Sequence, residues 1–119
     1  MNDHCQIELP KATAGDTEPL EVQWLKQGLP RDLSGRAISG AMQDMITKET
    51  RSIKGDMDLF DAEHGRFYWR YHEDDRGHEG RYWVQFRASD GNGSVWVTRK
   101  AVFHVERNIA DEHEGEASP

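Results

Sequence analysis

The stretch Arg81-Tyr82-Trp83-Val84-Gln85-Phe86-Arg87-Ala88-Ser89 has the clearest pattern in this sequence. Tyr82, Val84, Phe86 and Ala88 fall on one face when every second residue is taken. An apolar repeat of period two is typical of a β-strand with one buried face. The stretch therefore predicts a strand whose other face, with Trp83, Gln85 and Arg87, meets solvent or a partner.

The segments on both sides of this stretch extend the prediction. Asp90-Gly91-Asn92-Gly93 follows directly, and Asp-Gly and Asn-Gly readily adopt the positive φ values of tight hairpin turns. We therefore expect strands at 94–98 and 101–106. Upstream, 66–71 alternates Phe67, Trp69 and Tyr71 with Arg66, Tyr68 and Arg70, which predicts another strand.

The remaining strands are predicted from weaker patterns. Residues 21–26, 37–43 and 52–60 are expected to be strands, with Gly55 indicating a bulge or short break. Residues 28–32 and 61–65 are expected turns, and residues 45–49 fit either a helical turn or a loop. About seven short strands with frequent turns predict an all-β, immunoglobulin-like antiparallel sandwich, with a barrel as the related alternative.

Length and charge divide the chain into a body and two arms. At 119 residues it fits one domain. We expect an N-terminal arm at 1–19, a sandwich at 20–107 and an acidic tail at 108–119. The arms carry charges of −3 and −4, which together are the whole net charge of −7, and the body holds equal numbers of acids and bases.

This charge distribution and the cysteine count exclude several classes of function. A neutral body lacks the basic stripe that nucleic acid binding requires. The single cysteine, Cys5, rules out an intrachain disulfide and a cysteine metal cage. No signal sequence or long apolar run is present, so we expect a soluble protein made in the cytoplasm, without membrane contact.

Candidate sites for metals and catalysis are weak. The acid-rich loop at 72–79 lacks the alternating ligand spacing of calcium loops, and we interpret it as a solvated turn. His72 and His78 lack a third zinc ligand. Cys5 lies in an arm where nothing fixes a histidine against it. We therefore expect no metal, no cofactor and no enzymatic activity.

The strongest candidate site is an aromatic and arginine face. Tyr68, Trp83 and Trp96 fall opposite the predicted core positions of their strands, together with Arg70 and Arg87. A surface that mixes Trp, Tyr and Arg has the composition of a protein interface. The alternative is that these rings form the core and the two faces are inverted. We predict Tyr68, Arg70, Trp83, Arg87 and Trp96 as interface residues.

Four segments give the sequence a family resemblance. They are Asp32-Leu33-Ser34-Gly35, Gly65-Arg66-Phe67-Tyr68-Trp69, the run from Gly80 to Phe86, and Val102-Phe103-His104-Val105. Together they span about 20–107, which resembles the immunoglobulin-like N-terminal domain of the baseplate upper proteins of tailed bacteriophages. Members of that family have a long C-terminal part that is missing here, so a small accessory protein of the tail, neck, baseplate or capsid fits better than a baseplate organiser.

The resemblance implies a virion structural protein that is made in the host cytoplasm and built into the particle. Its partners would be other virion proteins, and it would form a homo-oligomer or a symmetric array there. Two alternatives remain open from the residues. One is a carbohydrate-binding module that uses the aromatic rings on a cell-surface glycan, and the other is an intracellular inhibitor of a host defence protein.

Overall fold

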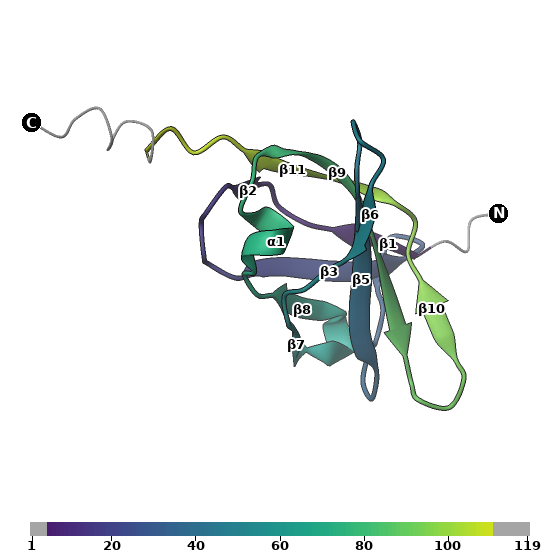
Figure 1. Cartoon of the computed structure of the whole chain (residues 1–119). Helices are drawn as coiled ribbons and strands as arrows, with labels where there is room; N and C mark the ends of the chain where they lie inside the picture. Colours follow the sequence, from purple (N-terminus) through teal and green to yellow (C-terminus); the bar gives the residue numbers. More distant parts are fainter. Residues whose placement is uncertain (1–4, 111–119) are drawn as a thin grey trace, which may run out of the picture.

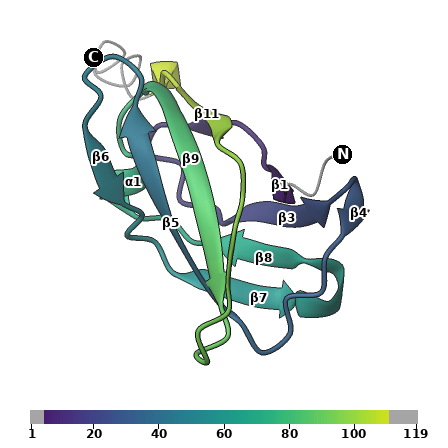
Figure 2. The same cartoon turned by 90° about the vertical axis from the view of Figure 1, so that its right-hand side faces the viewer.

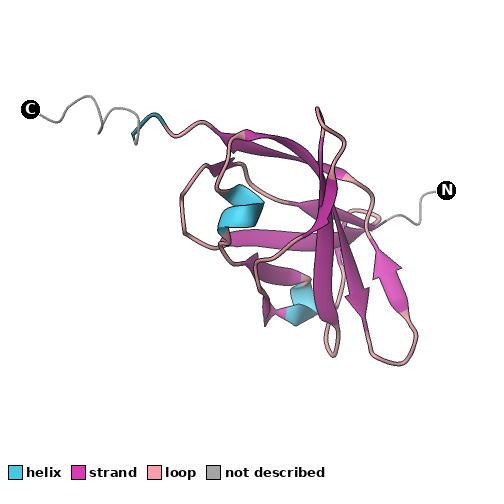
Figure 3. Ribbon diagram, in the orientation of Figure 1, coloured by secondary structure: helices cyan, strands magenta, loops and turns pink. Residues whose placement is uncertain are grey.

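The computed structural model describes residues 5–110, which fold into two β-sheets packed against each other (Figure 1). The strands are β1 (Cys5–Glu8), β2 (Ala12–Thr13), β3 (Leu20–Lys26), β4 (Leu29–Pro30), β5 (Ala37–Asp44), β6 (Thr50–Ser52), β7 (Met57–Asp61), β8 (Arg66–Trp69), β9 (Gly80–Ser89), β10 (Val95–Val97) and β11 (Ala101–Glu106). A 3₁₀ turn, η1 (Ala62–His64), and a short helix, α1 (Glu73–Arg76), interrupt them. Figure 3 shows how little of the chain is helical.

The strand order is that of an immunoglobulin sandwich. Sheet A has the order β1-β3-β8-β7, with β4 paired to β3, and sheet B has the order β2-β11-β9-β5-β6, with β10 paired to β9. When the seven main strands are lettered A to G in chain order, the two sheets are ABED and CFG, as in immunoglobulin domains. Figure 2 shows the strands of one sheet inclined to those of the other. The predicted fold class is confirmed.

The core lies between the two sheets and is built from alternate residues of β3, β8, β9 and β11. Trp69 is fully buried, with its ring centroid 4.9 Å from that of Phe103 and 5.8 Å from that of Phe86. Aromatic rings at such distances and tilts add stabilisation beyond their buried area. Six residues predicted for the core are buried: Phe67, Trp69, Tyr82, Val84, Phe86 and Ala88. Tyr71 is only partly buried.

The hydroxyl of Tyr82 donates a hydrogen bond to the carbonyl of His78, at 3.4 Å. A tyrosine at the start of the sixth main strand that bonds back to the preceding loop is a feature of immunoglobulin folds. The glycine-x-tyrosine pattern at 80–82 therefore marks the corner where the chain crosses from sheet A to sheet B.

The described part of the predicted N-terminal arm is not an arm. β1 pairs with β3 over four residues, from Cys5↔Lys26 to Glu8↔Gln23, and β2 pairs in parallel with β11. Cys5 and Ala12 are buried. The segment has too few apolar residues to form a core alone, but pairing with existing strands satisfies its backbone and lets its small apolar side chains cover the edges of the sandwich. Residues 1–4, and residues 111–119 of the predicted tail, lie outside the described residues.

Candidate functional site

The five predicted interface residues do not share one face. Tyr68 lies on β8, and Arg70 follows β8, so both belong to the outward side of sheet A. Trp83 and Arg87 lie on β9 and point outward from sheet B. Alternation along a strand separates inside from outside, but it does not say which sheet the strand joins. The predicted single face is therefore wrong, because consecutive strands β8 and β9 belong to opposite sheets.

The outward side of sheet A is an ordinary solvated face with its charges paired. Tyr68 stacks on Phe60 with ring centroids 4.1 Å apart. The guanidinium of Arg70 lies 2.7 Å from a carboxylate oxygen of Asp58, and that of Arg66 lies 3.9 Å from Glu21. Exposed ion pairs of this kind contribute little to stability, and they leave little unsatisfied charge for a partner.

Trp96 has a different position again. It pairs with Ala88, which is buried, so its ring turns toward the core side of sheet B. The guanidinium groups of Arg31 and Arg36 lie 3.5 Å and 3.3 Å from its ring centroid, and Arg36 also donates to the carbonyl oxygens of Ala88 and Ser94. Cation–π contacts therefore fix the ring at the end of the sandwich, and Trp96 holds the β9–β10 hairpin.

The register of the β9–β10 hairpin could have predicted the position of Trp96. The turn at 90–94 places Val95 opposite Ser89 and Trp96 opposite Ala88. Ala88 was already predicted to face the core, so counting back across the turn would have put Trp96 inward. Val95 and Val97 point outward instead, and with Val102 they are exposed apolar residues that the sequence interpretation did not single out.

The outward side of sheet B is the best candidate for a functional surface, and we call it the sheet B face. Its residues come from β5, β6, β9, β10 and β11 and from the β10–β11 connection: Ser39, Ala41, Gln43, Thr50, Ser52, Trp83, Gln85, Arg87, Val95, Val97, Lys100 and Val102. Trp83 lies between Gln43 and Val102. Arg87 lies between Ser39 and Val97.

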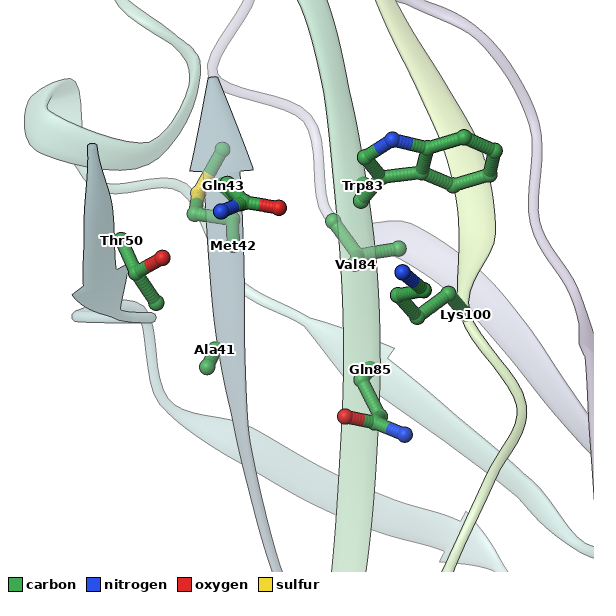
Figure 4. Close-up of a pocket in the computed structure, with 8 residues that line it drawn as sticks. All are labelled: Ala41, Met42, Gln43, Thr50, Trp83, Val84, Gln85 and Lys100. Atoms are coloured by element: carbon green, nitrogen blue, oxygen red, sulfur yellow. The ribbon is translucent and has the colours of Figure 1, made fainter. Parts of the chain in front are cut away.

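The sheet B face is shallow, and its exposed valines lie on β10 and β11. Val97 and Val102 are each about half exposed, at 51% and 53%, and Val95 is exposed at 41%. Two depressions, of about 200 Å³ and 560 Å³, share Ala41 and Gln85 in their lining. Figure 4 shows the smaller one, with Trp83 and Lys100 on one side and Gln43 and Thr50 on the other. The ammonium of Lys100 lies 5.4 Å from the Trp83 ring centroid.

The charged residues near the centre of the sheet B face, Arg87 and Lys100, are positive. Among the described strand residues of this side, the carboxylate is that of Glu106 at the end of β11. Within residues 5–110, neither Arg87 nor Lys100 forms an ion pair. The next outward position on β11 with a carboxylate, Glu106, lies 3.7 Å from Lys11. The face therefore combines exposed valines with a tryptophan and an arginine, and Trp and Arg are residue types that are enriched in protein interfaces.

The acid-rich loop at 72–79 is not simply a solvated turn. It forms α1, and both Asp75 and Arg76 are fully buried. Arg76 donates to the carbonyl oxygens of Glu18, at 2.8 Å, and Asp16, at 3.4 Å. Its burial lowers the pKa of the guanidinium from its ordinary value. The two side chains anchor α1 to neighbouring loops, so their role is structural.

Cys5 and the possible metal ligands give no second site. The thiol of Cys5 is buried and accepts a hydrogen bond from the guanidinium of Arg31 at 3.9 Å. In the part of the chain that the structure describes, His, Cys, Asp and Glu residues form no group of three or more that would hold a metal ion. Between residues 5 and 110, no helix is long and apolar enough to cross a membrane.

No protein-family model matches the chain, and no curated protein matches it as a relative.

Proposed function

We propose that this protein is a virion structural protein of a tailed bacteriophage, an immunoglobulin-like attachment module that binds neighbouring virion proteins through the sheet B face. The observation that carries the binding role is the composition of that face, where the exposed valines Val97 and Val102 pair with Arg87 and Trp83, and Lys100 lies beside Trp83. The phage assignment is supported by the resemblance over residues 20–107 and by the sandwich fold that the resemblance implies.

The shape of the sheet B face favours a protein partner. Sites for small molecules enclose most of their ligand, whereas the two depressions here lie side by side on an open sheet and share Ala41 and Gln85. A twisted sheet is also rigid, so an interface on it needs little ordering when a partner binds. Contact with a second protein surface uses this geometry best.

The same geometry gives less support to a glycan-binding module. A platform for sugar rings needs several exposed aromatic side chains, and Trp83 is the one aromatic residue of the sheet B face. Tyr68 lies on the other sheet, and Trp96 is enclosed by two arginines. Binding of the isolated protein to host polysaccharide would reverse this preference.

Mass spectrometry of purified particles of the encoding phage tests the virion assignment. We expect the protein at a fixed copy number relative to the major capsid and tail-tube proteins, set by the symmetry of the particle. Absence from the particles would contradict the proposal. An intracellular inhibitor of a host defence protein would then be tested by isolating a tight complex from infected cells.

A pair of matched variants tests the role of the face. Trp83→Ala with Arg87→Glu alters the sheet B face, and Tyr68→Ala with Arg70→Glu makes the same chemical change on sheet A. We expect the first pair to abolish incorporation into particles and the second to leave it unchanged, with both variants folded by circular dichroism. Equal incorporation would contradict the assigned face, even with the protein present in virions.

A further inference from the structure

We infer that the occupant of the sheet B face is the acidic C-terminal segment, residues 111–119, of a neighbouring copy of this chain. The inference rests on the proposed function, because it names the partner of the same face. Four observations support it: the charges of the two surfaces, an exposed apolar residue next to the acidic run, the place where the chain leaves the sandwich, and the length of the segment.

The charges of the segment and the face are complementary. Residues 111–119 contain Asp111, Glu112, Glu114 and Glu116 and no Lys or Arg. The face contains Arg87 and Lys100, with Arg81 further along β9, and its carboxylate, Glu106 at the end of β11, is paired with Lys11. Opposite charges steer two surfaces together and select against wrong partners. Two sheet B faces packed on each other would instead bring like charges together, which argues against a symmetric face-to-face dimer.

An exposed apolar side chain precedes the acidic run. Ile109 is 69% exposed, and the first acid, Asp111, follows two residues later. The face has a matching order, because Val97 pairs directly with Arg87 and Val102 lies two residues after Lys100. An apolar anchor next to charged contacts is the usual arrangement of a peptide that docks on a folded surface.

The chain leaves the sandwich on the side away from the centre of its own sheet B face. β11 ends at Glu106 beside Thr13 of β2 (Figure 1). Beyond it, the side-chain amide of Asn108 donates to the carbonyl of Ala14 at 2.9 Å. To reach its own Arg87, the segment would have to reverse and cross β11 to β9, whereas a copy placed beside the β2 edge receives it directly.

The segment is also long enough for this contact. Nine extended residues reach about 30 Å, and the ten residues of β9 span about 33 Å. One segment can therefore pass along the β9 side of a neighbouring face and reach both Lys100 and Arg87. A tail-to-face contact is heterologous, so repeated contacts build a ring or a filament, which suits a symmetric array in a particle.

Sedimentation velocity of the full chain over a range of protein and salt concentrations tests the inference. One variant neutralises the segment (Asp111→Asn, Glu112→Gln, Glu114→Gln, Glu116→Gln), and a second neutralises the face (Arg87→Gln, Lys100→Gln). The control removes two positive charges from sheet A (Arg66→Gln, Arg70→Gln). We expect the wild type to associate, the first two variants to associate at least about tenfold more weakly, and the control to behave as the wild type. Added salt should weaken the wild-type association.

Three results would overturn the inference. The first is a wild-type protein that stays monomeric at all concentrations. The second is association that neither neutralised variant weakens. The third is a monomer in which the indole NMR signal of Trp83 changes when the segment is neutralised, because the segment would then bind within its own chain.

The failure of this inference is separable from the failure of the proposed function. A chain that is monomeric in solution but present in particles refutes the tail-to-face contact and leaves the virion assignment standing. A chain that associates through residues 111–119 but is absent from particles refutes the virion assignment and leaves the tail-to-face contact standing.

Discussion

Asp75 is a buried carboxylate held by N–H donors from three residues. Its oxygens accept hydrogen bonds from the backbone of Lys54 at 2.8 Å, the backbone of Gly55 at 2.7 Å and the indole of Trp69 at 3.0 Å. Removing the carboxylate leaves these donors without an acceptor, which costs about 1–3 kcal/mol for each fully buried donor. We expect Asp75→Ala to lower the free energy of unfolding by about 3–4 kcal/mol, measured by urea denaturation.

The neighbouring acid provides the control. The carboxylate of Asp74 is largely exposed and lies 3.9 Å from the His72 ring, so Asp74→Ala should change the free energy of unfolding by less than about 0.5 kcal/mol. Equal effects of the two substitutions would show that Asp75 does not anchor the core.

The sequence predicts part of this cluster and not the rest. Gly55 indicates a break, and the chain does break there between β6 and β7. A glycine is needed at this position because a Cβ would lie 2.1 Å from the carbonyl oxygen of Arg70. That Asp75 is the acid that turns inward is not predictable from three adjacent acids. Its direction depends on the phase of α1 and on an indole that packs against it from another strand.

At the scale of the elements, aspartates close the turns that connect the strands. Asp44 accepts hydrogen bonds from the backbone N–H groups of Thr47 and Ile46, and Asp90 accepts from those of Asn92 and Ser94. These bonds favour the charged carboxylate and lower the pKa of both aspartates from the ordinary value of 3.8. Each group therefore stabilises the fold above its unfolded-state pKa, and this contribution is lost as the pH falls through the lower folded-state pKa.

Acid unfolding should reveal this contribution. We expect the stability of the wild type to fall as the pH drops below about 4, and Asp44→Asn and Asp90→Asn to make the fall shallower. Carboxyl-carbon NMR titration of the wild type should place the pKa of both groups below 3.8. Titration at or above that value would contradict the turn geometry.

The first strand gives a second test at this scale. Cys5 is 7% exposed, and its carbonyl accepts a hydrogen bond from the backbone of Arg99 at 2.8 Å. We expect a thiol reagent to label Cys5 at least about 100-fold more slowly in native protein than in urea, because β1 must open first. Leu29→Cys in a Cys5→Ser background should react at the unprotected rate, since Leu29 is 69% exposed. Equal rates for the two thiols would mean that β1 does not dock.

Strand positions follow from local pattern, whereas strand partners do not. Alternation predicted β9 and β11 closely, because every second side chain of these strands enters the core. β1 was missed because, beside its backbone pairing, it turns only Cys5 and Ile7 toward the core, which is too short an apolar repeat to stand out in the sequence. The sequence interpretation also missed that Tyr68 and Trp83 lie on opposite sheets, because the sheet that a strand joins is decided by contacts distant in sequence.

At the scale of the whole molecule, four of the seven net negative charges lie in residues 111–119. The described contacts on the C-terminal side include the hydrogen bond from Asn108 to Ala14, and Ile109 beyond it is 69% exposed. Deleting residues 111–119 removes four carboxylates and changes the net charge from −7 to −3. We expect this deletion to change the free energy of unfolding by less than about 0.5 kcal/mol, measured by urea denaturation.

A deletion that begins at Asn108 is the matched comparison. It also removes the hydrogen bond to Ala14, which is worth about 1 kcal/mol, so the longer deletion should be the less stable of the two. A loss of more than about 2 kcal/mol from the shorter deletion would mean that the acidic segment belongs to its own fold. If the shorter deletion keeps full stability, the sandwich does not need those carboxylates, and they remain available to the cations of a neighbouring sheet B face.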